Sequence, residues 1–387
     1  MIDKYVATMD CTGCTACAAI CPQECIAMTA DHYGFLYPAV DAEKCVECGL
    51  CEAACPLLHP MNMLGENPVA FAAYSKDEPL RQDSSSGGVF SELANTVLED
   101  GGAVFGAAYN EKFEVTHICV EDHRDLKKLR SAKYAQSDLQ GVFLQVKSCL
   151  GKGQRVLFCG TPCQVAGLKT YLGAAYENLV TVDFVCHSIP SPMAWKEYVK
   201  FRSLQDNSGE LPKYINLRSK ETGWSRYQYA NLFEYKDGTT HTVKSGQSLY
   251  MKLFIGGYIS RMSCADCRFK GYNRNSDLTL GDFWGIWDVA PDMDDNKGTS
   301  LVLVHSRCGM ELVERVSQRL VMREVSLDQT SKQNSAMLES YKAHPNREKM
   351  LSAIAEGNIA DCVDWVDRAG MNLSLRERIA RRLFGRK

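Results

Sequence analysis

Two cysteine-rich runs with the same internal spacing stand near the start of the chain. Both have the pattern C-x2-C-x2-C-x3-C followed by proline, and the second begins 34 residues after the first. The first run consists of Cys11, Cys14, Cys17 and Cys21. The second consists of Cys45, Cys48, Cys51 and Cys55. Thiols at this density are typical of either a disulfide scaffold or a set of metal thiolates.

The chain as a whole favours metal over disulfides. It has 18 cysteines in 387 residues, and nine of them fall within the first 55. Disulfide scaffolds belong mainly to short secreted chains. The first ten residues lack the basic segment and apolar stretch of a secretory signal. We therefore expect a cytoplasmic protein whose thiols bind metal.

The repeated run is the pattern of bacterial two-cluster ferredoxins, in which the fourth cysteine of each run ligates the other cluster. We expect one [4Fe–4S] cluster on Cys11, Cys14, Cys17 and Cys55. The second is expected on Cys45, Cys48, Cys51 and Cys21. Zinc also accepts four thiolates, but its knuckles use C-x2-C pairs rather than this run given twice. Cys25 lies outside both runs and is expected to be a buried thiol.

Composition excludes several classes of protein. Hydrophobic residues make up 45% and charged residues 24%, the balance of a globular chain. The net charge of −3 gives no bulk basic field for nucleic acid. No apolar run approaches the roughly 18 residues of a transmembrane helix.

The rest of the chain divides by pattern. Residues 1–58 form the small α+β ferredoxin-like domain, and 59–68 are a linker rich in proline. Residues 69–307 alternate between strands and helices, which predicts an α/β domain with a partly parallel sheet. Residues 308–387 are expected to be mostly helical. The strands are predicted at 69–74, 103–109, 115–120, 155–159, 179–186, 214–217, 229–235 and 301–305.

Two loops between a strand and a helix are candidate ligand sites. The first is S-S-S-G-G at 84–88, where hydroxyls and glycines precede a helix and suit an anion such as phosphate. Serine is also simply a good helix cap. The second loop is G-T-P-C-Q at 160–164. Ligands gather at the carboxyl ends of strands in open α/β sheets, where both loops fall. The segment 276–287 is expected to be a core turn with packed aromatics.

A third set of thiols is spread over three places in the α/β part. Its members are Cys163, Cys186, Cys264 and Cys267. Four thiolates could hold a third cluster or a zinc ion. A relay role beside two other clusters favours a third [4Fe–4S] cluster.

Six motifs in this order resemble the family of coenzyme F420 hydrogenase/dehydrogenase beta subunits, here joined to a two-[4Fe–4S] ferredoxin domain. Relatives in that family include F420H2 dehydrogenase, the F420-reducing hydrogenase beta subunit and 7-hydroxymethyl chlorophyll a reductase. The motifs are SSSGG (84–88), SAKYAQS (131–137), CGTPCQVAGLK (159–169), DFVCHS (183–188), CADCRF (264–269) and SDLTLGDFWG (276–285).

The resemblance implies a flavin, FAD rather than FMN, beside the third cluster in residues 69–307. It supports the third set of thiols as cluster ligands. The implied flavin-binding residues are Ser85, Ser86, Gly87, Gly88, Lys133, Tyr134, Gly160, Thr161, Gln164 and Asp282. Lys133 and His187 are the candidate catalytic residues, although His187 is also open to a purely structural role. Positive charge for an anionic flavin or a substrate phosphate could come from Lys133, Arg218, Lys220, Arg268 and Lys270, but each taken singly is rather expected to be a solvated surface charge.

The implied activity is that of an iron–sulfur flavoprotein oxidoreductase, which moves electrons between clusters and a flavin that exchanges hydride with its substrate. The expected partners are a ferredoxin or other redox protein, and a small organic substrate or deazaflavin coenzyme. The alternatives are an electron-relay subunit without its own substrate, and a cluster-bearing sensor. Residues 376–387 carry six basic residues of twelve and suit an acidic partner, an anionic membrane surface or a solvated helix.

Overall fold

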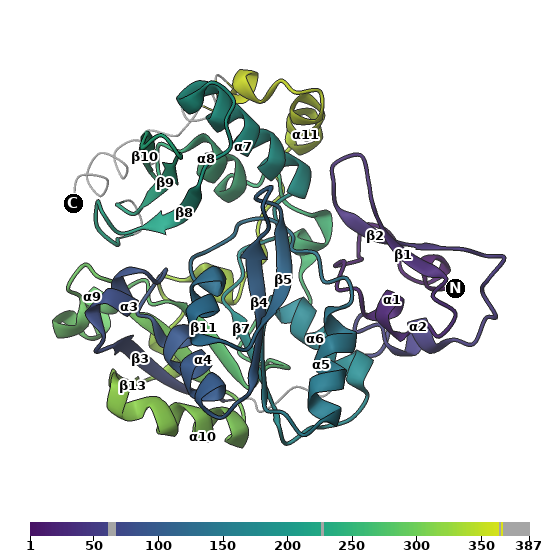
Figure 1. Cartoon of the computed structure of the whole chain (residues 1–387), viewed down its shortest axis with the longest axis horizontal. Helices are drawn as coiled ribbons and strands as arrows, with labels where there is room; N and C mark the ends of the chain where they lie inside the picture. Colours follow the sequence, from purple (N-terminus) through teal and green to yellow (C-terminus); the bar gives the residue numbers. More distant parts are fainter. Residues whose placement is uncertain (61–66, 226–227, 364, 367–387) are drawn as a thin grey trace.

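The computed structural model describes residues 1–60, 67–225, 228–363 and 365–366. A small N-terminal unit, residues 1–60 (the head), lies beside a larger α/β unit (the body), next to α5 and α6 (Figure 1). The predicted linker 59–68 lies partly outside the described residues, and the basic segment 376–387 lies wholly outside them. None of the helices formed by the described residues is both long and apolar enough to span a bilayer.

The head has the small α+β architecture that the cysteine runs predict. Each run leads into a short helix, α1 (Ala16–Ile20) or α2 (Leu50–Ala53). Between the runs, β1 (Ile26–Ala30) and β2 (Leu36–Val40) form an antiparallel hairpin. A single 3-10 turn, η1 (Ile2–Lys4), precedes them.

The body is built on one mixed sheet, in the order β13-β3-β12-β11-β7-β6-β4-β5. The four neighbours β11, β7, β6 and β4 are parallel and the outer pairs are antiparallel, which confirms the predicted partly parallel sheet. In chain order the strands are β3 (Val69–Ser75), β4 (Ala103–Tyr109), β5 (Val115–Val120), β6 (Val156–Cys159), β7 (Leu179–Phe184), β11 (Leu278–Asp282), β12 (Ser300–Val304) and β13 (Leu320–Val325).

Helices cover both faces of this sheet. Helices α4 (Val89–Glu99) and α10 (Arg307–Val316) pack on one face, and α5 (Val142–Gly151) and α6 (Pro162–Leu172) on the other. Because side chains alternate along a strand, Leu157 of β6 packs with the first pair and Phe158 with the second. The parallel strands are therefore buried on both sides, and their carboxyl ends are the edge left for a site.

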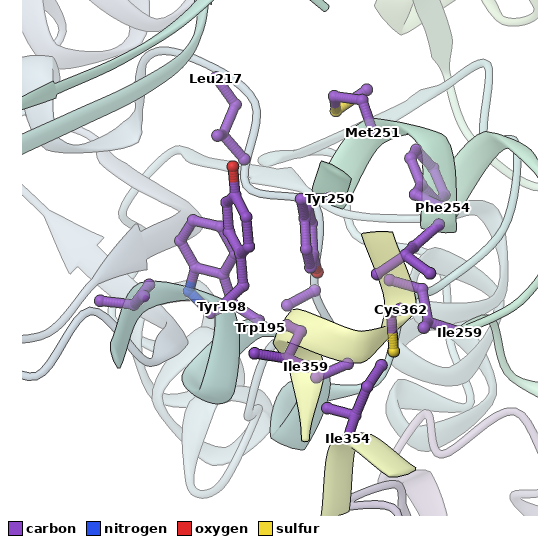
Figure 2. Close-up of a cluster of buried hydrophobic side chains, with 14 of the residues drawn as sticks. Trp195, Tyr198, Leu217, Tyr250, Met251, Phe254, Ile259, Ile354, Ile359 and Cys362 are labelled. Atoms are coloured by element: carbon purple, nitrogen blue, oxygen red, sulfur yellow. The ribbon is translucent and has the colours of Figure 1, made fainter. Parts of the chain in front are cut away.

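A second lobe stands above those carboxyl ends. It contains a three-stranded antiparallel sheet, β8 (Tyr214–Ser219), β9 (Ala230–Glu234) and β10 (Thr240–Lys244). Helices α7 (Pro192–Asn207), α8 (Leu249–Ile255) and α11 (Arg347–Ala355) pack with it around Trp195, Tyr198, Tyr250 and Phe254 (Figure 2). Two short helices, α3 (Glu78–Gln82) and α9 (Ile286–Val289), lie in the loops of the body.

Two segments differ from the sequence prediction. Strand β13 pairs antiparallel with β3 inside the region expected to be helical. Its Arg323 and Glu324 are exposed at the edge of the sheet, so the strand lacks a clear apolar pattern. Residues 278–282 were expected in a core turn and instead form β11, between β7 and β12. Glycine is depleted in strands, so Gly281 in this segment argued against a strand when only the sequence was considered.

Candidate metal and cofactor site

The third set of thiols comes together in the body. Cys163 lies in the first turn of α6, Cys186 follows β7, and Cys264 and Cys267 lie on and directly after η3 (Met262–Asp266). All four side chains line one pocket with about 630 Å³ of space, part of it open to solvent. Three segments far apart in sequence thus bring four thiols to one place.

Burial sets the protonation state of three of these thiols, Cys163, Cys186 and Cys264. It is the main cause that raises the pKa of Cys163 to about 11 and of Cys264 to about 12, and each is raised further by Cys267. Burial also raises the pKa of Cys186 well above its usual value. Without a positive charge such thiols stay protonated, whereas a bound metal converts them to thiolates. The donor set is all sulfur, which by its chemistry suits an iron–sulfur cluster or zinc. Among the described residues, however, no three His, Cys, Asp or Glu side chains form a group that could hold a single metal ion.

The head holds two further sets. Cys21, Cys45, Cys48 and Cys51, called the second set below, line one pocket with about 380 Å³ of space. The other set, called the first set below, consists of Cys11, Cys14, Cys17 and Cys55. In it, burial raises the pKa of Cys17 to about 12, and Cys11 and Cys55 raise that pKa further. Cys51 of the second set also raises the pKa of Cys17, so the two sets lie next to each other, and the crossed ligand assignment stays a prediction.

Cys25 is buried as expected, and it is also close to the second set. Its Sγ lies 3.3 Å from Sγ of Cys21, and the side chain lines the same pocket.

The first set lies against the body, next to the third. A Cβ atom on Gly167 of α6 would lie only 2.9 Å from Sγ of Cys14. Asp10, Thr12 and Leu57 of the head line the pocket of the third set. The third set therefore faces the first set across the junction between head and body.

Arg261 holds the head and the body together, and no motif in the sequence pointed to this residue. Its guanidinium is fully buried and donates to the carbonyl oxygens of Cys11 (2.8 Å) and Leu36 (3.0 Å) and to Oε1 of Gln136 (3.0 Å). It also lies 4.1 Å from the ring centroid of Tyr37. The only available signal was a charged residue three positions before Cys264, which alone predicts nothing.

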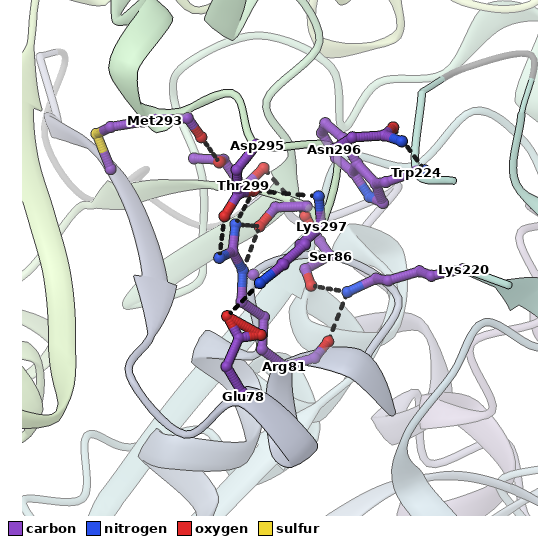
Figure 3. A network of polar contacts seen from close by, with 12 residues as sticks. Glu78, Arg81, Ser86, Lys220, Trp224, Met293, Asp295, Asn296, Lys297 and Thr299 are labelled. Atoms are coloured by element: carbon purple, nitrogen blue, oxygen red, sulfur yellow. Dashed lines mark hydrogen bonds and ion pairs between the residues drawn. The ribbon is translucent and has the colours of Figure 1, made fainter. Parts of the chain in front are cut away.

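The loop 84–88 is held by buried cations. Lys220 Nζ donates to the carbonyl oxygens of Arg81 (2.5 Å) and Ser86 (2.6 Å), and Arg81 forms a bidentate ion pair with Asp295 (Figure 3). Burial lowers the pKa of Lys220 to about 7, helped by Arg81. A Cβ on Gly87 would lie 2.4 Å from the Ala73 carbonyl oxygen. Close packing on β3 thus explains that glycine without any ligand.

Three of the predicted flavin residues, Ser85, Tyr134 and Asp282, meet around Arg218. Its guanidinium pairs with Asp282 at 2.8 Å and donates to the Ser85 carbonyl oxygen at 3.3 Å. Tyr134 lies close enough to Arg218 and Asp282 for both to affect its pKa, which burial raises. Nε of Arg218 is buried without a hydrogen-bond partner among the described residues. The preceding residue, Lys133, donates to the Arg130 carbonyl oxygen at 2.5 Å, and burial lowers its pKa to about 7.

Hydrogen bonds within the protein hold the loop 160–164 in place. Gly160 precedes the cap residue Thr161, whose N–H donates to Oε1 of Gln164 at 2.9 Å in a capping box. Nε2 of Gln164 donates to Oγ of Ser137. Oγ1 of Thr161 lies 3.1 Å from Sγ of Cys163. These groups therefore position a thiol of the third set, and Gln164 is already engaged within the protein.

His187 lines the pocket of the third set. Its ring meets the edge of Phe254 at 5.1 Å between centroids, and its Nε2 is buried with no partner among the described residues. Burial, with Lys270 adding, lowers its pKa to about 4. The imidazole is therefore neutral near pH 7.

Comparison with known proteins gives three family matches. Residues 70–143 and 153–330 match the N-terminal and C-terminal parts of the family described as "Coenzyme F420 hydrogenase/dehydrogenase, beta subunit". Residues 10–57 match the "4Fe-4S dicluster domain". The two beta-subunit matches together cover most of the body.

Individual relatives are more distant. The chain is 24% identical to an F(420)H(2) dehydrogenase subunit of Methanosarcina mazei over 183 residues, 44% of this chain and 51% of that protein. It is 38% identical to a 7Fe ferredoxin of Hydrogenibacillus schlegelii over 55 residues, 14% of this chain and 64% of that protein. The chain thus matches less than two thirds of each relative.

A chain in the solved F420-reducing [NiFe] hydrogenase complex of Methanosarcina barkeri is 14% identical, with a TM-score of 0.46, and the match covers 79% of this chain and 93% of that one. On the strength of the family matches, the protein belongs to the family of coenzyme F420 hydrogenase/dehydrogenase beta subunits and carries a 4Fe-4S dicluster domain ahead of the part that defines it.

Proposed function

We propose that this protein is a flavin-dependent iron–sulfur oxidoreductase that links a two-electron substrate to a one-electron redox protein. The observation that carries the proposal is the pocket of the third set, which four cysteines of the body line together with Asp10, Thr12 and Leu57 of the head. An all-sulfur site at the junction with a dicluster domain suits a third [4Fe–4S] cluster, with Cys163, Cys186, Cys264 and Cys267 as ligands.

The order of the thiol sets supports a linear relay. The first set faces the third set, because Cys14 packs on Gly167. The second set has a pocket lined by head residues alone. Electrons would therefore pass between an outside carrier and the body through the second set, the first set and then the third.

The residues around Arg218 fit FAD. Arg218 and Lys220 are buried cations next to the loop 84–88, and the unpartnered Nε of Arg218 is a donor suited to a phosphate oxygen. Tyr134, which is half-buried and packs on buried Phe254 at 5.0 Å between centroids, offers aromatic surface for a flat ring. When bound, the flavin supplies two-electron exchange with the substrate and one-electron exchange with clusters.

The chain's own residues would orient the substrate and supply protons. Lys133, with its pKa near neutrality, can carry or release a proton in the physiological range. Neutral His187 can hydrogen-bond through its free Nε2 without adding charge beside the third set. We assign Lys133 as the proton-carrying residue and His187 as a neutral hydrogen-bonding group. The substrate class is a small organic molecule or a deazaflavin coenzyme.

A test is anaerobic stopped-flow reduction of the purified protein with reduced F420, NADPH or reduced ferredoxin in turn. We expect acid extraction of the protein to release FAD. We also expect one of the three donors to bleach the absorption of both the flavin and the clusters. Lys133→Met should slow bleaching while FAD content is retained. Absence of extractable flavin from protein that still holds iron would overturn the flavin part.

The second candidate function is an electron-relay subunit without a substrate of its own. The name of the Methanosarcina mazei relative, a dehydrogenase subunit, favours it. Turnover of a small donor by the isolated chain would argue against this alternative, and reduction only through a partner protein would support it.

A further inference from the structure

The second set of thiols opens on the surface of the head. Cys48 is exposed, and its neighbours Val46 and Leu50 leave 62% and 43% of their surface exposed. Both apolar side chains line the pocket of this set. The first set, by contrast, is covered by α6, with Cys17 and Cys55 buried. An outside carrier can therefore approach the second set more closely than the first.

The head carries a strong negative charge. Residues 1–58 contain four aspartates and four glutamates against two lysines and no arginine, a net charge of −6, while the whole chain has −3. Glu47 and Glu52 line the pocket of the second set. Glu24 and Glu43 are exposed and lie within three residues of Cys21 and Cys45 in the sequence. Glu52 is paired with the N-terminal amine, and Glu47 lies only 4.0 Å from Lys4 in an exposed pair. The apolar centre thus has an acidic rim.

We propose that this face, centred on Val46, Cys48 and Leu50, is the docking surface for a basic one-electron carrier protein. The inference rests on the proposed function, since it needs the second set to hold a cluster. Apolar side chains at the centre exclude water from the contact, and a ring of opposite charge steers the partner and fixes its orientation. An acidic carrier would be repelled by the same rim.

The transfer itself balances simply. One electron leaves the reduced cluster of the second set and reduces one oxidised centre of the carrier, and no bond forms or breaks. Acidic rims that steer a partner raise association rates by about 10- to 1000-fold, and salt removes that gain.

The test uses two redox proteins of opposite charge as probes. The full-length holoprotein, reduced with dithionite and freed of excess reductant, is mixed anaerobically with oxidised mitochondrial cytochrome c, which is basic, or plastocyanin, which is acidic. We expect cytochrome c to be reduced at least about tenfold faster at about 0.02 M salt, and the advantage to fade by about 0.5 M. Equal rates for both probes, or a cytochrome c rate insensitive to salt, would overturn the proposal.

Charge-reversal variants test whether the carrier docks at the second set. Glu43→Lys/Glu47→Lys should slow cytochrome c reduction at low salt by about three- to tenfold. The control Glu210→Lys/Glu314→Lys changes net charge equally on exposed positions of the body and should leave the rate within about twofold. Val46→Gln should lower the rate with the salt dependence unchanged. An equal loss in the control pair would contradict docking at the second set.

A further measurement separates the two proposals. Dithionite should bleach the clusters equally in the wild type and in every variant, and p-benzoquinone, a small uncharged electron acceptor, should reoxidise them at equal rates. Protein that dithionite cannot reduce would overturn the proposed function itself. Protein that passes electrons to p-benzoquinone but shows no charge preference between the two redox proteins would overturn only the docking surface.

Discussion

Gly167 of α6 lies directly against Cys14 of the head, so close that a Cβ at Gly167 would stand 2.9 Å from the Sγ atom. No real Cβ tolerates such a distance, so the head can approach the body this closely only because residue 167 lacks a side chain. This contact sets the spacing between the first and third sets of thiols.

Replacing Gly167 should therefore push the head away from α6. We expect Gly167→Ala to cost about 1–3 kcal/mol, as overpacking does, and to slow electron exchange between head and body. Gly151→Ala is the matched control, because Gly151 ends α5 with nothing within 4 Å of its added methyl group. Urea unfolding measures the change in stability, and the rate at which the clusters are reoxidised measures the change in electron exchange. A Gly167→Ala protein as stable and as fast as the control would contradict close packing here.

Arg261 should be the strongest single link across the junction. Arg261→Met removes three hydrogen bonds across the junction, and each loss should cost about 1–3 kcal/mol where water cannot replace the donor. Oε1 of Gln136 keeps the Leu36 N–H as a donor, so the two carbonyl oxygens should account for most of the loss. Thermal unfolding should shift down by several degrees, and limited proteolysis should release the head. For comparison, Arg307→Gln removes a guanidinium that is 92% exposed and should change stability by less than about 0.5 kcal/mol. Similar melting curves for the two variants would contradict this role.

The buried ion pair between Arg218 and Asp282 gives a third prediction. Asp282→Asn leaves the buried guanidinium without its counter-ion, which should cost about 3–5 kcal/mol. Asp292→Asn breaks an exposed pair with Arg323 and should cost at most about 1 kcal/mol. The free energy of unfolding in urea distinguishes the two. FAD content should also fall in Asp282→Asn, and equal losses of stability in the two variants would argue against a buried charge at Arg218.

The lowered pKa of Lys133 predicts how the stability of the folded protein changes with pH. Its pKa is about 7 in the folded protein, chiefly because of burial, against 10.5 for an ordinary lysine. Between these values the unfolded chain binds more protons than the folded one, so stability should rise with pH from about 7 to about 10. Below pH 7 both states are protonated and the contribution is constant.

The check is unfolding of the flavin-free protein at several pH values, beside Lys133→Met. Because burial also lowers the pKa of Lys220 to about 7, the variant should keep that residue's part of the rise between pH 7 and 10 and lose only the part due to Lys133. Its advantage over the wild type should be largest below pH 7. Parallel pH profiles for the two proteins would show that Lys133 is not the titrating group.

The sequence could predict what local spacing encodes. The thiol sets of the head follow from C-x2-C-x2-C-x3-C given twice, because three thiols one turn apart converge on one side of a loop. The strands of the body, such as Val156–Cys159, follow from short apolar runs that the sheet buries on both faces.

The sequence could not predict features set by long-range packing. Arg261 binds a carbonyl oxygen 250 positions away, and no local pattern signals such a contact. Gly87 looked like part of an anion-binding loop, yet its backbone packs on the Ala73 carbonyl oxygen of β3. Strand β13 is held by pairing with β3 at the edge of the sheet, where exposed side chains carry no apolar alternation.

The central claim is that the third set holds an iron–sulfur cluster, and metal analysis of anaerobically purified full-length protein tests it most directly. We expect about twelve irons per chain in the wild type and in Cys308→Ala, whose thiol lies on α10, outside the three sets. Cys264→Ala should retain about eight irons, with the ferredoxin-type signals of the head intact. Zinc in place of iron at this site, or an iron content that Cys264→Ala leaves unchanged, would contradict the account.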